Sequence, residues 1–199
     1  MTVFEMLVVC GLLGLLMLFL SPVLVPAGRI IQRADTDTHA QQIAVVALEK
    51  LFQDLGYSDA RGFTLQQTPL LILSYPSMLP PNWNGLTPLD PLNDLNMIAI
   101  FTPPVTWLKF SMIYYDSTAQ ILYRKDMPYL GGNQLANVKL SRLGAFAANG
   151  QPSSVIATGV QSFKLLHLST NVLNVDLTVA QTWDVQRIIH LQTDICPRN

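Results

Sequence analysis

The pattern of apolar and polar residues shows a long apolar run at the start of the chain. Residues 1–28 carry one charged side chain, Glu5, and the 23 residues from Met6 to Gly28 carry none. A helix of that length spans roughly 34 Å at about 1.5 Å per residue, enough to cross a bilayer core of about 30 Å. Cleaved secretory signals have a basic start and a shorter apolar run. The pattern therefore predicts an uncleaved membrane or filament-core helix over residues 1–28.

Helix-weakening residues interrupt this run. Pro22 and Pro26 lack a backbone N–H and crowd the preceding turn, which predicts a kink or a break from Pro22 to Pro26. Gly14 weakens the helix or lets another backbone approach closely. Two interpretations stay open, an ordinary kinked anchor and a helix that packs and partly opens at Gly14, Pro22 and Pro26.

The helical pattern continues over residues 29–56. Apolar residues recur there at spacings of three and four and fall mostly on one face. They are Ile43, Val46, Leu48, Leu51, Phe52 and Leu55. Gly56 is a natural helix stop. We expect an amphipathic continuation of the helix that packs against a folded domain.

Residues 57–199 read as a strand-rich globular domain. Short apolar runs predict strands. They span residues 70–75, 97–102, 107–115, 120–125, 160–168, 172–180 and 185–195. Asp116–Ala119 gives a hairpin signal, and the last strands alternate apolar and polar residues, as strands with one buried face do. The predicted class is α+β, a long N-terminal helix packed on an antiparallel sheet.

Two stretches, residues 76–96 and 128–154, fit no regular element. The first holds five prolines and Trp83, and the second holds several glycines. Loops of this length are usually functional or disordered. We expect them on the outer surface, as contact or binding loops or as solvated loops with Trp83 tucked in.

Composition narrows the function classes. Half of the residues are hydrophobic, 13% are charged, and the net charge is −1. Such a sparsely charged chain suits packing against copies of itself, and it has no basic cluster that would indicate nucleic-acid binding. Cys10 and Cys196 are not expected to pair, because a helix residue in the membrane and a tail residue would not come within about 7 Å.

No motif for catalysis, a cofactor or a metal stands out, and we expect no enzyme. The histidines, His39, His167 and His190, are far apart and form no metal-binding pattern. Asp90 and Asp94 could bind calcium through loop oxygens, but they lack the spacing of a recognised site.

Glu5 raises a physical question, because a carboxylate at membrane depth is costly and usually has a partner. No cation of the same chain lies within helical reach. Glu5 could extend to the interface, be protonated, or pair with a positive group of another molecule, such as the amino group of Met1 in a neighbouring copy.

The stretch Met1-Thr2-Val3-Phe4-Glu5, followed by an apolar run with Gly14 and Pro22, resembles the processed N-terminus of type IV pilins and pseudopilins. Phe4 departs from the family pattern, which has a smaller aliphatic residue there. The resemblance implies a Met1 exposed by a prepilin peptidase and N-methylated, and a Glu5 that neutralises the amino terminus of an adjacent subunit.

The resemblance also implies a location and partners. The subunit would wait in the inner membrane and then join a homopolymer at the bacterial cell surface, an extracellular pilus built by assembly machinery. Leu122-Tyr123-Arg124 and the terminal Arg198-Asn199 loosely resemble larger minor pilins. A minor pilin or pseudopilin that primes or caps a filament or a secretion pseudopilus is therefore an alternative. A single-pass membrane-anchored binding or sensing domain is another.

Overall fold

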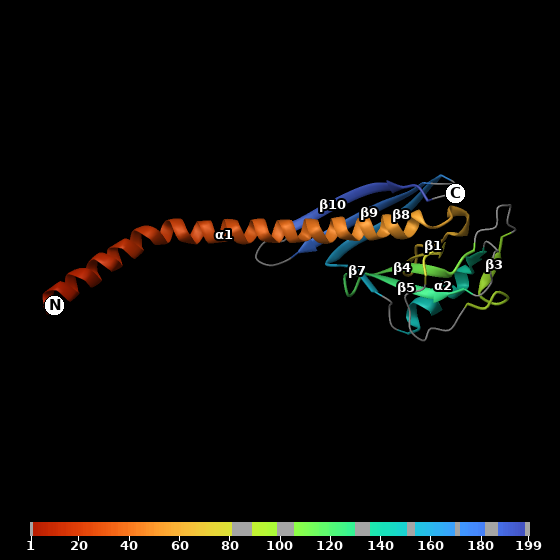
Figure 1. The fold of residues 1–199 in the computed structure, drawn as a ribbon, viewed down its shortest axis with the longest axis horizontal. Helices are drawn as coiled ribbons and strands as arrows, with labels where there is room; N and C mark the ends of the chain where they lie inside the picture. The colour runs from red at the N-terminus through yellow and green to blue at the C-terminus, as the bar shows by residue number, and fades with distance from the viewer. Residues whose placement is uncertain are drawn as a thin grey trace.

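The structure is a computed structural model that describes residues 2–80, 89–98, 106–129, 136–150, 154–169, 172–181 and 187–197. A long helix, α1 (Val3–Gly56), opens the chain, and the strands gather around its C-terminal half (Figure 1). The N-terminal half projects away from them. This is the α+β arrangement that the sequence predicts.

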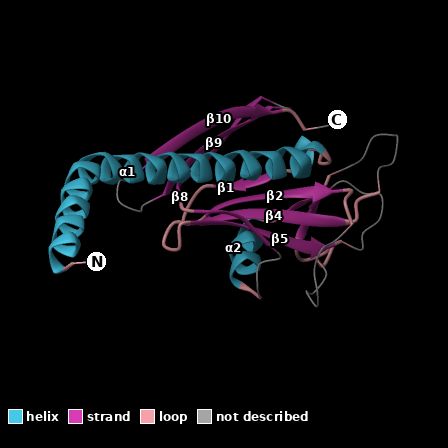
Figure 2. Ribbon diagram, turned by 60° about the vertical axis from the view of Figure 1, so that its left-hand side comes forward, coloured by secondary structure: helices cyan, strands magenta, loops and turns pink. Residues whose placement is uncertain are grey.

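Helix α1 is continuous through Pro22 and Pro26. Figure 2 shows a bend within its projecting half, so the predicted kink is confirmed and the predicted break is wrong. The two prolines are four residues apart and therefore lie on one side of the helix. Bending away from that side relieves both ring clashes, while the remaining backbone hydrogen bonds keep the helix closed.

All strand pairs named here are antiparallel, and they form three sheets rather than the single expected one. The five-stranded sheet has the order β1-β2-β4-β5-β7. Its strands are β1 (Thr64–Gln66), β2 (Leu71–Ser77), β4 (Lys109–Asp116), β5 (Ile121–Pro128) and β7 (Ser154–Thr158). The three-stranded sheet has the order β10-β9-β8, with β8 (Val160–Ser169), β9 (Val172–Gln181) and β10 (Arg187–Ile195). The third sheet pairs β3 (Leu95–Met97) with β6 (Ala136–Val138).

Six predicted strands correspond to β2, β4, β5, β8, β9 and β10, but β1 and β7 were not predicted. The loop expected over residues 76–96 was wrong at its two ends, which belong to β2 and β3. The hairpin joining β4 to β5 is confirmed, because Asp116 Oδ1 accepts hydrogen bonds from the N–H groups of Thr118 and Ala119. The expected strand over residues 97–102 is described only up to residue 98, and the part described as a strand ends at Met97.

The C-terminal half of α1 packs on β9 and β10 and also contacts β2 and β7. Its buried apolar residues are Ala40, Ala44, Ala47, Leu51 and Leu55. The predicted apolar face was wrong for Val46 and Phe52, which are 46% and 43% exposed. Alanines bring the helix axis close to the sheets, so the smallest apolar side chains, rather than the largest, mark the packed face.

The opposite face of the five-stranded sheet carries β3, β6 and a second helix, α2 (Leu140–Ala148). The structure contains one further helical turn, η1 (Ala60–Gly62). The loop predicted over residues 128–154 was therefore wrong at α2 and β6. Helix α2 is short, contains Gly144 and has no side-chain N-cap, so its local signals are weak. Leu143 and Ala147, both buried, hold it against the sheet. Trp83 lies outside the described residues.

Gly159 turns the chain from one large sheet into the other. Strand β7 pairs with β5, and β8, which begins at Val160, pairs with β9. Gly159 has φ +69°, and a Cβ there would lie 2.7 Å from the carbonyl oxygen of Ala180. The turn is closed by a 2.8 Å hydrogen bond from the Ala180 N–H to the Gly159 carbonyl oxygen. Only glycine meets both requirements without strain.

We expect Gly159→Ala to lower the free energy of unfolding by about 1–3 kcal/mol, because it combines an unfavourable φ with a clash against backbone. Gly144→Ala is the matched control. Among the described residues nothing lies within 4 Å of a Cβ at Gly144, and alanine favours helix by up to about 1 kcal/mol. Urea unfolding of both variants in detergent micelles measures the difference, and equal stabilities would contradict the role given to Gly159.

Candidate functional site: the exposed apolar helix

The projecting half of α1 is apolar on every side, and no other described part of the chain covers it. An 18-residue window of α1 reaches a mean hydropathy of 2.6 with none of it buried, so α1 is long and apolar enough to cross a membrane. Phe4 and Leu18 are 75% and 74% exposed. A continuous apolar surface of this kind marks a contact with lipid or with protein.

Glu5 has a polar partner within its own chain. The backbone N–H of Thr2 donates to Glu5 Oε2 over 2.8 Å, and the Glu5 N–H lies 3.4 Å from Thr2 Oγ1. This is a capping box, which satisfies two free N–H groups at the start of α1. The carboxylate also faces the positive end of the helix dipole. Sequence reasoning missed this arrangement, although Thr2 and Glu5 have the spacing that signals it.

The structure places the other predicted assembly residues as follows. Gly14, Pro22 and Pro26 line one shallow hollow along α1, together with Met17, Leu18 and Val25. They are helical here, and a Cβ at Gly14 would meet nothing within 4 Å among the described residues. The hollow is therefore open to a neighbouring helix. Met1 lies outside the described residues, so its place relative to Glu5 stays a prediction.

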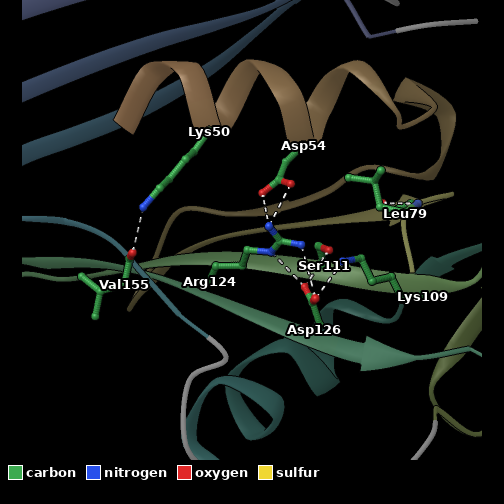
Figure 3. A network of polar contacts seen from close by, with 9 residues as sticks. Lys50, Asp54, Leu79, Lys109, Ser111, Arg124, Asp126 and Val155 are labelled. Carbon is green, nitrogen blue, oxygen red and sulfur yellow. Dashed lines mark hydrogen bonds and ion pairs between the residues drawn. The ribbon is translucent and has the colours of Figure 1, made fainter. Parts of the chain in front are cut away.

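A second candidate site is a network of charged and polar side chains inside the domain, between the end of α1 and the five-stranded sheet (Figure 3). Arg124 on β5 is 2.8 Å from Asp54 on α1 and 3.0 Å from Asp126 on its own strand. Asp126 also accepts hydrogen bonds from Lys109 Nζ (2.7 Å) and Ser111 Oγ (2.9 Å) on β4. Two acids and two bases thus form a network without net charge.

Burial perturbs these groups. It raises the pKa of Asp54, against the opposing effect of Arg124. It also lowers the pKa of Lys109, which the hydrogen bond to Asp126 opposes. For Asp126, burial acts to raise the pKa, but the hydrogen bonds from Lys109 and Arg124 together outweigh it and leave the pKa below its usual value.

Titratable groups with perturbed pKa values often indicate a catalytic site, but the central groups of this network are shielded from solvent. The side chains of Lys109 and Asp126 are 1% and 0% exposed and are bound to each other. The network also joins α1 to the sheet through the ion pair of Arg124 and Asp54. Sequence reasoning missed the network. The sequence does contain one sign of it. Lys109 and Ser111 are two residues apart, as are Arg124 and Asp126, and this spacing places each pair on one face of its strand.

Comparisons with family models, curated proteins and solved structures found no match to this chain. The described residues contain no group of three or more His, Cys, Asp or Glu side chains that could hold a metal. Asp90 and Asp94, the calcium alternative, are engaged in their own turn, and Asp94 also lies 3.4 Å from Arg142. Cys10 and Cys196 are free and exposed.

We expect Arg124→Met to lower the free energy of unfolding by about 3–5 kcal/mol, because it leaves buried carboxylates without their partner. Arg142→Met is the control. Arg142 lies 3.4 Å from Asp94, but its side chain is 49% exposed and that of Asp94 is 15% exposed, and a pair near the surface contributes about 0–1 kcal/mol. Urea unfolding at neutral pH compares the two variants. Similar losses of unfolding free energy in both would contradict the role given to Arg124.

The network also predicts how stability depends on pH. Because the pKa of Asp126 is lowered in the folded chain, its contribution is complete above the ordinary value of 3.8 and is lost as pH falls through the folded value. The pKa of Asp54 is raised, so its contribution is complete below 3.8 and is lost as pH rises through the folded value.

Unfolding free energies between about pH 2 and pH 6 test this opposition of signs. Relative to the unchanged chain, stability should rise less steeply with pH in Asp126→Asn and more steeply in Asp54→Asn. Slopes that change in the same direction in both variants would contradict the assignment.

Proposed function

We propose that this chain is a structural subunit of a type IV pilus-like filament, assembled through a bundle of N-terminal apolar helices. The observation that carries the proposal is the division of α1, whose first half is apolar and exposed while its second half is packed on the folded domain. A helix divided in this way can place its exposed half in a membrane and later among the same halves of other copies.

The proposed assembly has a physical order. The projecting half of α1 first holds the subunit in the inner membrane, since its length and hydropathy suit a bilayer. Glu5 then pairs with the amino group of a processed, N-methylated Met1 in the preceding subunit, because a paired carboxylate is far less costly in a low dielectric than an unpaired one. The hollow along Gly14, Pro22 and Pro26 takes a neighbouring helix.

Two alternatives share part of this support. A minor pilin or pseudopilin that primes or caps a filament would use the same helix and the same Glu5. A membrane-anchored domain that acts singly would need only the hydropathy and length of α1, and neither Glu5 nor the hollow would matter. The resemblance of residues 1–28 to pilins favours the filament, with a prepilin peptidase and an assembly machinery as partners.

Glu5 distinguishes the filament from the single anchor, and its capping role must be separated from its charge. Glu5→Gln removes the charge but keeps an acceptor for the Thr2 N–H, since glutamine also forms a capping box. Thr2→Ala removes the Oγ1 acceptor and keeps the charge. We expect filaments to be lost in Glu5→Gln and retained in Thr2→Ala, as counted by electron microscopy of cells that express each variant as the sole copy.

Membrane fractionation and mass spectrometry of the N-terminus provide the controls, because both variants must insert and be processed equally. Filaments that persist in Glu5→Gln would refute charge pairing between subunits. Loss only in Thr2→Ala would instead mean that Glu5 acts solely as a helix cap.

A further inference from the structure

Helix α2 and helix α1 lie on opposite sides of the five-stranded sheet (Figure 2). On the side of α2, residues of β4, β5 and α2 line a pocket of 510 Å³. Its floor is formed by Tyr114 and Tyr123, which face each other across β4 and β5 with ring centroids 5.3 Å apart. Asp116 stands at one side, and Gly144 and Ala147 of α2 form the other. Strand alternation places Tyr114 and Asp116 on the same face.

The pocket presents polar groups that the described residues leave unused. Asp116 Oδ1 accepts two N–H groups of the β4–β5 turn, but Oδ2 has no partner among the described residues. The hydroxyls of Tyr114 and Tyr123 likewise make no hydrogen bond within the described part of the chain. The lining is otherwise apolar, which is typical of small-ligand sites with a few directing polar groups.

Three features of this pocket favour a positive charge. The Asp116 carboxylate is negative, and the rings of Tyr114 and Tyr123, which are stacked on each other, carry hydroxyl oxygens that can accept a hydrogen bond from an ammonium group. The pocket also lies beside the last turn of α2, which contains no basic residue, and the C-terminal end of a helix dipole is negative.

The chain itself places an ammonium group against the same end of α2, outside the pocket lining. Lys125, on the same face of β5 as Tyr123, extends its Nζ to the carbonyl oxygen of Phe146 in the last turn of α2, at 2.6 Å. Its side chain is 2% exposed, so the contact is buried. The charge of Lys125 opposes a second cation nearby, so the binding of a cation in the pocket depends on the Asp116 carboxylate.

We propose that this pocket binds a soluble alkylammonium ligand, with its cationic head between Asp116 and the two tyrosine rings and its apolar part against Gly144 and Ala147. A soluble ligand fits better than a lipid headgroup, because α2 and the pocket lie on the opposite side of the sheet from α1. The proposal for this site does not rest on the proposed filament.

Titration of the full chain with choline in maltoside micelles, which contain no ammonium group, tests the proposal. The ring signals of Tyr114 and Tyr123 in NMR spectra should shift in a saturable way as choline is added. The uncharged analogue of choline, 3,3-dimethylbutan-1-ol, should bind about tenfold more weakly than choline. Equal binding of the two ligands, or no shift of the ring signals with choline, would overturn the proposal.

Three variants locate the site. Asp116→Asn keeps the acceptor for the turn and should weaken choline binding about tenfold. Gly144→Leu places a side chain in the pocket and should abolish binding, whereas Gly144→Ala should retain it. Thermal unfolding of each variant verifies that it is folded, and unchanged choline affinity in both Asp116→Asn and Gly144→Leu would contradict this location.

Discussion

The first half of α1 is apolar around its whole circumference, and nothing in its own described chain covers it. In water such a surface is unfavourable by about 25 cal/mol for each Å² of apolar area left exposed. The first half of α1 is therefore expected to contact lipid or protein, and in the proposed filament the protein is the same surface of other copies. Both states of a filament subunit meet this expectation, one before and one after assembly, whereas a single anchor meets it only in lipid.

Glu5 shows how one residue can be accommodated both in the membrane and in the proposed filament. Within one chain its carboxylate accepts the Thr2 N–H and lies at the positive end of α1, which makes an ionised group tolerable near a membrane interface. These contacts supply hydrogen bonds and a partial charge, but no full counter-charge. A full cation from another subunit is consequently still favourable, and more so as the surroundings exclude water.

Strong periodicity made much of this fold predictable. The uncharged run to Gly28 predicted a helix, and the alternation of Leu173, Val175 and Leu177 predicted a strand with one buried face. Both elements are present, although the helix is not broken at Pro22 to Pro26. The Ala40, Ala44 and Ala47 stripe was missed because hydrophobicity weighs large side chains more than small ones. The network around Asp126 was missed because it depends on the register of β4 against β5 and on the packing of α1, which brings Asp54 to Arg124 from 70 residues away.

The ion pair between Asp54 and Arg124 fixes the position of α1 along its axis, which the alanine stripe alone does not fix. A smooth stripe of small residues fixes the position of a helix along its axis poorly, since a shift of one turn, about 5.4 Å, replaces Ala40 by Ala44 with little change in packing. The charges are not interchangeable in that way. A one-turn shift would bring either Lys50, which repels Arg124, or Ser58, which cannot neutralise it, into the place of Asp54. Buried ion pairs often add less to stability than apolar packing, but here the pair selects one register of α1. That register sets how far the apolar half projects from the domain, and therefore where a neighbouring subunit would meet it.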